Sequence, residues 1–168
     1  MSDSSRYFSR DELTCKCGCG ACDVSDVLLQ KLDALRERMG HALAVRSGCR
    51  CENHNREEGG KEHSPHLAGA GRVCKAADIQ VGTPRQAYYL VGEALDLGFV
   101  GIGPNTKQGF VHLDVADTLP RPALWTYPMK RLLAVVGLPL SVQMRSRPPH
   151  ICRNIPVRRR PSASSPTT

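Results

Sequence analysis

The chain has 168 residues, of which 40% are hydrophobic and only 5% aromatic, and this fits one domain with a mainly aliphatic core. Its net charge of +7 is unevenly placed, because the residues from Met129 on hold eight Lys and Arg and no Asp or Glu, against 15 basic and 16 acidic residues before them. The near-neutral body argues against nucleic-acid binding by the domain itself, whereas the basic tail is either a solvated, disordered segment or a contact for an anionic polymer.

The apolar runs of the chain are too short to cross a membrane. The longest, residues 132–142, is broken by a glycine and a proline, whereas a helix needs about 20 apolar residues to span a bilayer. The N-terminus, M-S-D-S-S-R-Y-F, is polar and lacks the apolar segment of a signal peptide. We therefore expect a protein without a membrane span or signal peptide, synthesised in the cytoplasm.

The first half of the chain predicts two helices and one strand. Ser9 and Glu12 have the S-x-x-E form of a helix cap. Residues 25–39 predict a longer helix, because leucines and a methionine recur on one stripe and a glycine follows them. Residues 42–47 predict a short strand, and the polar residues 52–75 predict a loop.

The second half predicts three strands around one helix. Residues 76–81, 99–102 and 110–115 predict strands, and a turn is expected at residues 104–109. Residues 83–97 predict a helix that begins at a Thr-Pro pair. The positions of this helix expected to face inward are Tyr89, Val91, Ala94 and Leu97.

Polar residues interrupt two of these apolar strands. Asp78 lies in the run A-A-D-I, and a buried carboxylate must be paired, protonated or bound to a metal. Phe110, His112 and Asp114 share one face of the last strand, because side chains alternate along a strand. A histidine and an aspartate on one face of an aliphatic strand indicate that this face lines a site.

Cysteines are unusually frequent, and most of them fall in two clusters. The eight are Cys15, Cys17, Cys19, Cys22, Cys49, Cys51, Cys74 and Cys152. One interpretation is a structural zinc site on the first four, although only the last pair of these has the usual spacing of zinc ligands. The alternative is a disulfide that joins Cys15 or Cys17 to Cys49 or Cys51, and free thiols in a reducing cell also agree with the pattern.

Several coupled motifs over about residues 7–127 resemble the zinc D-Ala-D-Ala carboxypeptidase family, which includes phage endolysin peptidases and shares its fold with the hedgehog signalling domain. The family pattern S-x-H-x-x-G-x-A-x-D is matched by Ser64, His66, Gly69, Ala76 and Asp78. The later family histidine is matched by His112 in F-V-H-L-D, and residues 47–55, S-G-C-R-C-E-N-H-N, are similar to the family segment S-G-Y-R…H-N.

One spacing and two positions depart from the family pattern. Eleven residues separate His66 from Asp78, which is more than the pattern has. Cys49 replaces the family tyrosine, and Gly109 stands where relatives often carry an acidic residue. The extra residues are compatible with a metal site only if His66 and Asp78, at the two ends of this segment, still lie close together.

The resemblance implies an α+β fold, in which a small antiparallel sheet with helices packed against it carries the site. It implies a zinc peptidase domain at residues 1–128, followed by a basic tail rich in Pro, Arg and Ser at residues 129–168. Its zinc ligands would be His66, Asp78 and His112.

Two further residues receive roles from the resemblance. Arg50 would anchor a carboxylate of the substrate through parallel hydrogen bonds. Asp114 is a candidate for the general base, and it is an equal candidate for a residue that orients a ligand imidazole.

The function implied is zinc-dependent hydrolysis of the stem or cross-bridge peptides of peptidoglycan, as a carboxypeptidase or an endopeptidase, at the bacterial cell wall or periplasm. The absence of a signal peptide fits a phage or prophage endolysin, which reaches the wall through a partner pore. The alternatives are a non-catalytic zinc-binding module whose basic tail binds nucleic acid, and an inactive family member that retains zinc.

Overall fold

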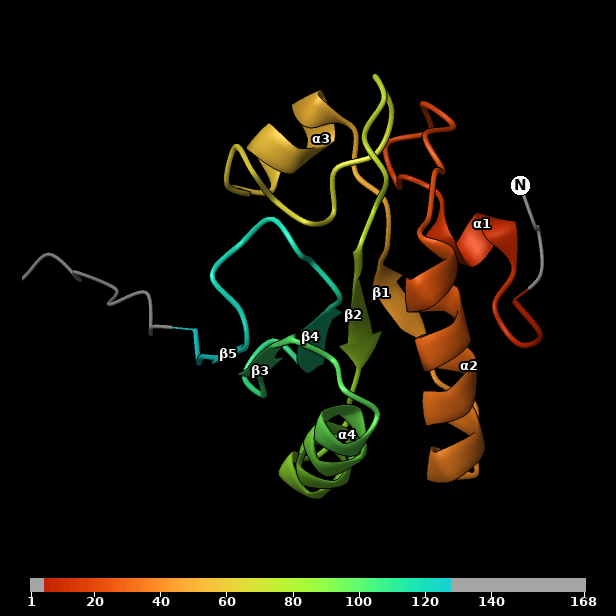
Figure 1. Cartoon of the computed structure of the whole chain (residues 1–168), viewed down its shortest axis with the longest axis vertical. Coiled ribbons are helices and arrows are strands. Elements are labelled where there is room, and N and C mark those ends of the chain that lie inside the picture. Colours follow the sequence, from red (N-terminus) through yellow and green to blue (C-terminus); the bar gives the residue numbers. More distant parts are fainter. Residues whose placement is uncertain (1–4, 128–168) are drawn as a thin grey trace, which may run out of the picture. The chain divides into compact units, whose positions relative to one another are not determined.

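The computed structural model describes residues 5–127, so the expected tail at residues 129–168 lies outside the described residues. Figure 1 shows the sheet and the helices packed beside it. The prediction of an α+β fold is confirmed. Within the described range, no helix has both the length and the apolar composition that crossing a bilayer would require.

Five strands form one sheet in the order β1-β2-β4-β3-β5. They are β1 (Val45–Ser47), β2 (Ala76–Gln80), β3 (Gly101–Asn105), β4 (Phe110–Asp114) and β5 (Ala123–Leu124). The first four pair antiparallel, as expected. The short β5 was not predicted, and it pairs parallel to β3 at the edge of the sheet.

Two of the helices begin where the sequence predicts, and the longer of them also ends there. In α1 (Arg10–Leu13), Ser9 and Glu12 form the reciprocal hydrogen bonds of a capping box. The longer α2 (Asp26–Met39) ends at Gly40, whose φ of 69° lies in the left-handed region that glycine adopts without strain.

The core lies between one face of the sheet and two helices, α2 and α4 (Pro84–Asp96). Residues of alternate positions on the central strands enter it together with leucines of α2 and α4. These strand residues are Ala77, Ile79, Ile102, Val111 and Leu113. Because side chains alternate along a strand, the residues between them lie on the opposite face of the sheet.

The prediction for the inward face of α4 was wrong in part. The fully buried positions are Ala87, Leu90 and Ala94, whereas Tyr89 is 51% exposed. The buried set follows the three-to-four-residue spacing of a helix stripe. Tyr89 lies outside that stripe.

Residues 52–75 are not entirely loop, because α3 (Glu52–Glu57) lies within them. Cys51 is the N-cap of α3, a position at which sulfur replaces the usual oxygen acceptor. The expected turn at residues 104–109 also begins later, since β3 extends to Asn105. Figure 1 shows α3 at the end of the sheet where β1 ends and β2 begins, and α4 towards the other end.

Candidate metal centre

The sheet register places four residues in one row across β1, β2, β4 and β3. Ser47 pairs with Asp78, Asp78 with His112, and His112 with Gly103. Paired residues of neighbouring strands point to the same face, which here is the face opposite the core. The strand pattern of the sequence therefore brings Asp78 and His112 side by side.

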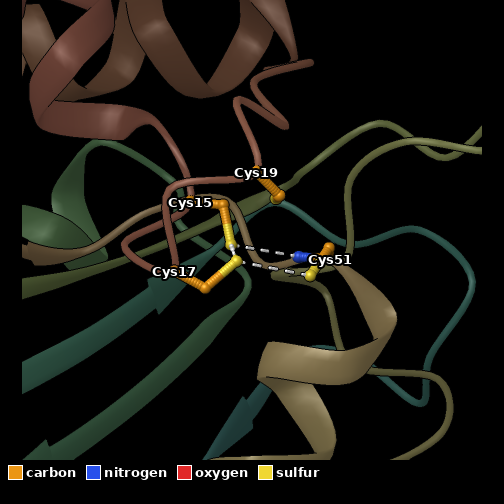
Figure 2. A group of neighbouring side chains, drawn as sticks. All are labelled: Cys15, Cys17, Cys19 and Cys51. Atoms are coloured by element: carbon orange, nitrogen blue, oxygen red, sulfur yellow. Dashed lines mark hydrogen bonds between the residues drawn. The ribbon is translucent and has the colours of Figure 1, made fainter.

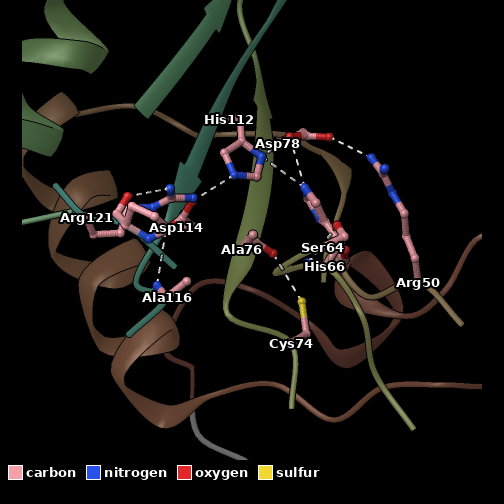
Figure 3. A network of polar contacts seen from close by, with 12 residues as sticks. Arg50, Ser64, His66, Cys74, Ala76, Asp78, His112, Asp114, Ala116 and Arg121 are labelled. Atoms are coloured by element: carbon pink, nitrogen blue, oxygen red, sulfur yellow. Dashed lines mark hydrogen bonds and ion pairs between the residues drawn. The ribbon is translucent and has the colours of Figure 1, made fainter. Parts of the chain in front are cut away.

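Three polar atoms converge at this row, as Figure 3 shows. His66 Nε2 lies 3.0 Å from His112 Nδ1 and 3.3 Å from Asp78 Oδ1. The remaining pair, His112 Nδ1 and Asp78 Oδ1, is 2.9 Å apart. All three residues are buried. Zinc bonds to nitrogen and oxygen of about 2.0–2.1 Å require tetrahedral ligands about 3.3 Å apart, so the separations fit one ion.

The hydrogen bonds behind the two imidazoles fix which nitrogen carries a proton. His66 Nδ1 donates to the carbonyl of Gly48 at 2.8 Å, and His112 Nε2 donates to Asp114 Oδ2 at 3.2 Å. The inward nitrogens, together with Asp78 Oδ1, then present three lone pairs to one another. Such an arrangement needs a cation or an extra proton between the acceptors, so the donor set fits zinc.

The pKa shifts follow from the same contacts. Burial lowers the pKa of the His66 imidazole, which keeps it in the neutral form that a metal requires. For Asp78, burial raises the pKa, but the charges of the neighbouring His66 and His112 imidazoles lower it further than burial raises it. Asp114 and Asp78 raise the pKa of His112 against the effect of burial.

His66 reaches the row of site residues from a segment that lies outside the sheet. Arg50 N donates to the carbonyl of His66 at 2.7 Å, and Ala68 N donates to the carbonyl of Arg50 at 2.9 Å. These two bonds form a short parallel bridge between Arg50 and Leu67. The S-G-C-R segment and the S-P-H-L segment are thus held together by their backbones.

The extra residues between His66 and Asp78 fold back on themselves. Gly69 and Arg72 exchange two backbone hydrogen bonds of 3.1 and 3.0 Å, and the two residues between them have positive φ, 53° for Ala70 and 79° for Gly71. This is the backbone of a tight hairpin turn. The insertion therefore loops out, and the condition that both ends of the site converge is met.

Arg50 contacts the candidate ligand Asp78. Its Nη2 lies 2.9 Å from Asp78 Oδ2, and its Nε donates to Ser47 Oγ at 2.9 Å. The side chain of Arg50 is 13% exposed. The guanidinium thus holds the carboxylate oxygen that faces away from the imidazoles.

Asp114 lies behind His112 and is fully buried. Its Oδ1 accepts from Ala116 N at 3.1 Å and from Arg121 Nε at 3.0 Å, and its Oδ2 accepts from Arg121 Nη2 at 2.6 Å in addition to His112. Both oxygens are therefore engaged. These contacts hold the pKa of Asp114 at about 2, although burial alone would raise it.

Two glycines of β3 make room for this arrangement. A Cβ at Gly101 would lie 2.0 Å from Asp114 Oδ2, and a Cβ at Gly103 would lie 2.5 Å from the ring of Trp125. The Trp125 ring in turn lies 5.3 Å from the His112 ring, centroid to centroid. The G-I-G sequence of β3 thus leaves space for a carboxylate and an aromatic ring.

Sequence reasoning missed Arg121, Trp125 and the two glycines as parts of the site. Arg121 and Trp125 follow the last long strand in an irregular segment, where no periodicity assigns a direction to a side chain. The alternation of glycine in G-I-G beside a strand with His and Asp was a usable signal, because glycine in a strand often marks a close approach.

The structure brings three of the four expected cysteines together and replaces the fourth. Cys15, Cys17 and Cys19 lie with Cys51, whereas Cys22 packs against Cys49 and Cys74. The expected set of four ligands was wrong at Cys22. Spacing along the chain favoured Cys22, whereas the fold brings Cys51 close to the other three cysteines. Every cysteine within the described residues is a free thiol.

Comparison with known proteins gives a match to a family model. The family model described as Peptidase M15 matches residues 6–114, which is well over half of the chain. No curated protein matches the chain. The matched range contains the three converging residues and Arg50, and it ends at Asp114, so Arg121 and Trp125 lie beyond it.

Proposed function

Because the chain belongs to the peptidase M15 family, we propose that it hydrolyses peptide bonds of bacterial peptidoglycan with a zinc ion held by His66, Asp78 and His112. The observation that carries this proposal is the convergence of three buried acceptor atoms within 3.3 Å of one another. When bound, zinc supplies a water molecule of lowered pKa and polarises the scissile carbonyl. Family membership makes it a zinc peptidase, and the substrate is the part we propose.

The sequence left two roles open for Asp114, the general base and the residue that orients a ligand imidazole. We assign it the orienting role. Its Oδ2 accepts the Nε2 proton of His112, which leaves Nδ1 free to bind the metal. Arg121 neutralises the buried carboxylate through two hydrogen bonds. A general base must reach the attacking water, and a carboxylate with both oxygens engaged behind a ligand does not meet that requirement.

Arg50 has two roles in this proposal. It orients Asp78 through Nη2, and its Nη1 edge binds a carboxylate of the peptide substrate. A stem peptide ends in such a carboxylate, and an anionic group is attracted to a guanidinium that is largely shielded from water. The site thus favours substrates with a carboxylate close to the bond that is cut.

Tyr127 adds a hydrogen-bond donor near the site. Burial and the charge of Asp78 raise the pKa of its phenol, so the hydroxyl stays protonated at neutral pH. Its ring packs against Phe110, with centroids 5.5 Å apart.

The substrate and place of action rest on the resemblance stated for the sequence. A peptidase of this kind acts at the cell wall or in the periplasm, and a phage or prophage endolysin is the setting we propose. A basic tail would add attraction to anionic wall polymers. A non-catalytic zinc module, by contrast, would bind zinc and leave peptidoglycan intact.

Digestion of purified peptidoglycan tests this function. The full chain is incubated with peptidoglycan with and without a zinc chelator, and the products are identified by mass spectrometry. Free D-alanine would identify a carboxypeptidase, and new amino termini within cross-links would identify an endopeptidase. A variant with His66→Ala and His112→Ala is the control. Intact peptidoglycan with a zinc-loaded wild type would refute the proposal.

A further inference from the structure

A second cluster of metal-binding side chains lies in the N-terminal part of the domain. We propose that Cys15, Cys17, Cys19 and Cys51 bind a structural zinc ion that ties the N-terminal loop to the segment carrying Arg50. The four residues are distinct from the histidines and aspartate of the first site. This inference therefore does not depend on the proposed peptidoglycan substrate.

The sulfur positions are those expected of ligands around one ion. The four Sγ atoms all lie within 4.8 Å of one another, with Cys15 and Cys17 3.4 Å apart and Cys17 and Cys51 3.7 Å apart. Zinc–sulfur bonds of about 2.3 Å give a tetrahedron with edges of about 3.8 Å. Figure 2 shows the side chains of the loop turned towards Cys51.

A disulfide explains this cluster less well than a metal ion does. Sulfur atoms in a disulfide are about 2.05 Å apart, and the separations above are well beyond this. One disulfide would also use only two of the four thiols. A tetrahedral thiolate site uses all of them, and zinc is the common redox-inert metal for four sulfur ligands.

The backbone of the loop supports the same geometry. Gly18 and Gly20 have φ of 81° and 75°, values that glycine adopts without strain. Gly18 N donates to the carbonyl of Cys15 at 3.3 Å, and Cys15 N donates to the carbonyl of Ala21 at 2.9 Å. Gly18 separates Cys17 from Cys19, and Gly20 follows Cys19. Their turns let closely spaced cysteines direct their side chains to the same point.

Hydrogen-bond donors surround the sulfur atoms. Cys51 N lies 3.4 Å from Cys15 Sγ, and His54 N lies 3.5 Å from Cys51 Sγ. The imidazole Nδ1 of His54 lies 3.2 Å from Cys15 Sγ. Donors of this kind compensate the negative charge that four thiolates place on one divalent ion.

The position of Cys51 connects this site to the first one. Cys51 follows Arg50 and caps α3, and Cys49 N donates to the carbonyl of Leu13 at 2.8 Å. The backbone bond of Cys49 holds the chain just before Arg50, and a metal bond to Cys51 would hold it just after Arg50. The ion would therefore fix the segment from which Arg50 reaches Asp78.

Metal analysis of the full chain, purified in the presence of reductant, tests the proposal. We expect two zinc ions per chain in the wild type and one in a variant with Cys17→Ser and Cys19→Ser. Both cysteines are exposed, so the substitutions remove no buried packing. Cys22→Ser, a cysteine of the same region outside the cluster, is the matched control and should retain two.

The His66→Ala, His112→Ala variant separates the two sites. Its one remaining zinc should be replaceable by cobalt, and the cobalt form should show thiolate-to-metal charge-transfer absorption that Cys17→Ser with Cys19→Ser abolishes. One zinc in the wild type and none in the histidine variant would overturn the proposal. A disulfide among the four cysteines of protein isolated with zinc present and without reductant would overturn it as well. Neither result would count against peptidoglycan hydrolysis, and the first would place the single zinc at the histidine site.

Discussion

Replacing Asp114 with asparagine should weaken zinc binding rather than abolish the chemistry. The substitution keeps the size of the side chain but places an amide NH2 where one carboxylate oxygen stands. If the amide oxygen keeps its bonds to Ala116 N and Arg121 Nε, the NH2 faces two donors, His112 Nε2 and Arg121 Nη2. The conflict with His112 disappears if its proton moves to Nδ1.

That proton movement determines the size of the effect. Nδ1 of His112 is the nitrogen that lies 2.9 Å from Asp78 Oδ1, so a proton there competes directly with the metal. Returning the proton to Nε2 means giving up a hydrogen bond, which costs about 1–3 kcal/mol for a buried group. A tenfold change in an equilibrium constant is about 1.4 kcal/mol. We therefore expect zinc affinity to fall by about 10–100-fold, as is typical of residues that orient metal ligands.

Zinc affinity is measured by competition with a chromogenic chelator, and peptide hydrolysis is measured as a function of added zinc. Hydrolysis by Asp114→Asn should recover to near the wild-type kcat at saturating zinc. Asp117→Asn is the matched control, because Asp117 is exposed and pairs with Lys75. Wild-type zinc affinity with a kcat that stays low at saturating zinc would refute the orienting role and restore Asp114 as a general base.

Three further predictions test the surroundings of the site. Arg50→Lys should raise KM at least tenfold for peptides with a free carboxylate and leave KM for amidated peptides unchanged, because lysine cannot bind Asp78 and a carboxylate in parallel; equal effects on both would contradict the anchoring role. Gly101→Ala should destabilise the domain by about 1–3 kcal/mol in thermal denaturation, because its Cβ would overlap Asp114, whereas Gly92→Ala, with open space around the Cβ in α4, should stabilise it by about 0.5–1 kcal/mol. Ala70→Gly should raise the melting temperature or leave it unchanged despite the flexibility of glycine, because Ala70 has a φ of 53°; clear destabilisation would contradict this.

The strands and long helices could be predicted because each carries a periodic pattern. The stripe of α2 and the alternation in β4 each assign a buried face without knowledge of the rest of the fold. That alternation placed His112 and Asp114 on one face, and the register then placed Asp78 beside His112. Local sequence therefore predicted which residues line the row, while pairing between strands determined how close they lie.

Other features have no local sequence pattern from which they could be predicted. Cys51 joins Cys15 across a separation of 36 residues along the chain, although Cys22 is the nearer candidate in sequence. Arg121 reaches Asp114 from a segment without periodicity. Short helices such as α3 are also difficult to predict, because a few residues contain too little of a repeat to distinguish it from a polar loop.

The hairpin at Gly69 to Arg72 allows the number of residues between His66 and Asp78 to vary without changing how these two ligands lie. Its two backbone hydrogen bonds close the excursion before the chain enters β2, so residues added at its tip would not need to move His66 or Asp78. Doubling the length of a flexible loop costs only about 0.6 kcal/mol in closure entropy. This turn is therefore a place where a protein engineer could graft an affinity tag or a wall-targeting peptide a few residues from the metal ligands.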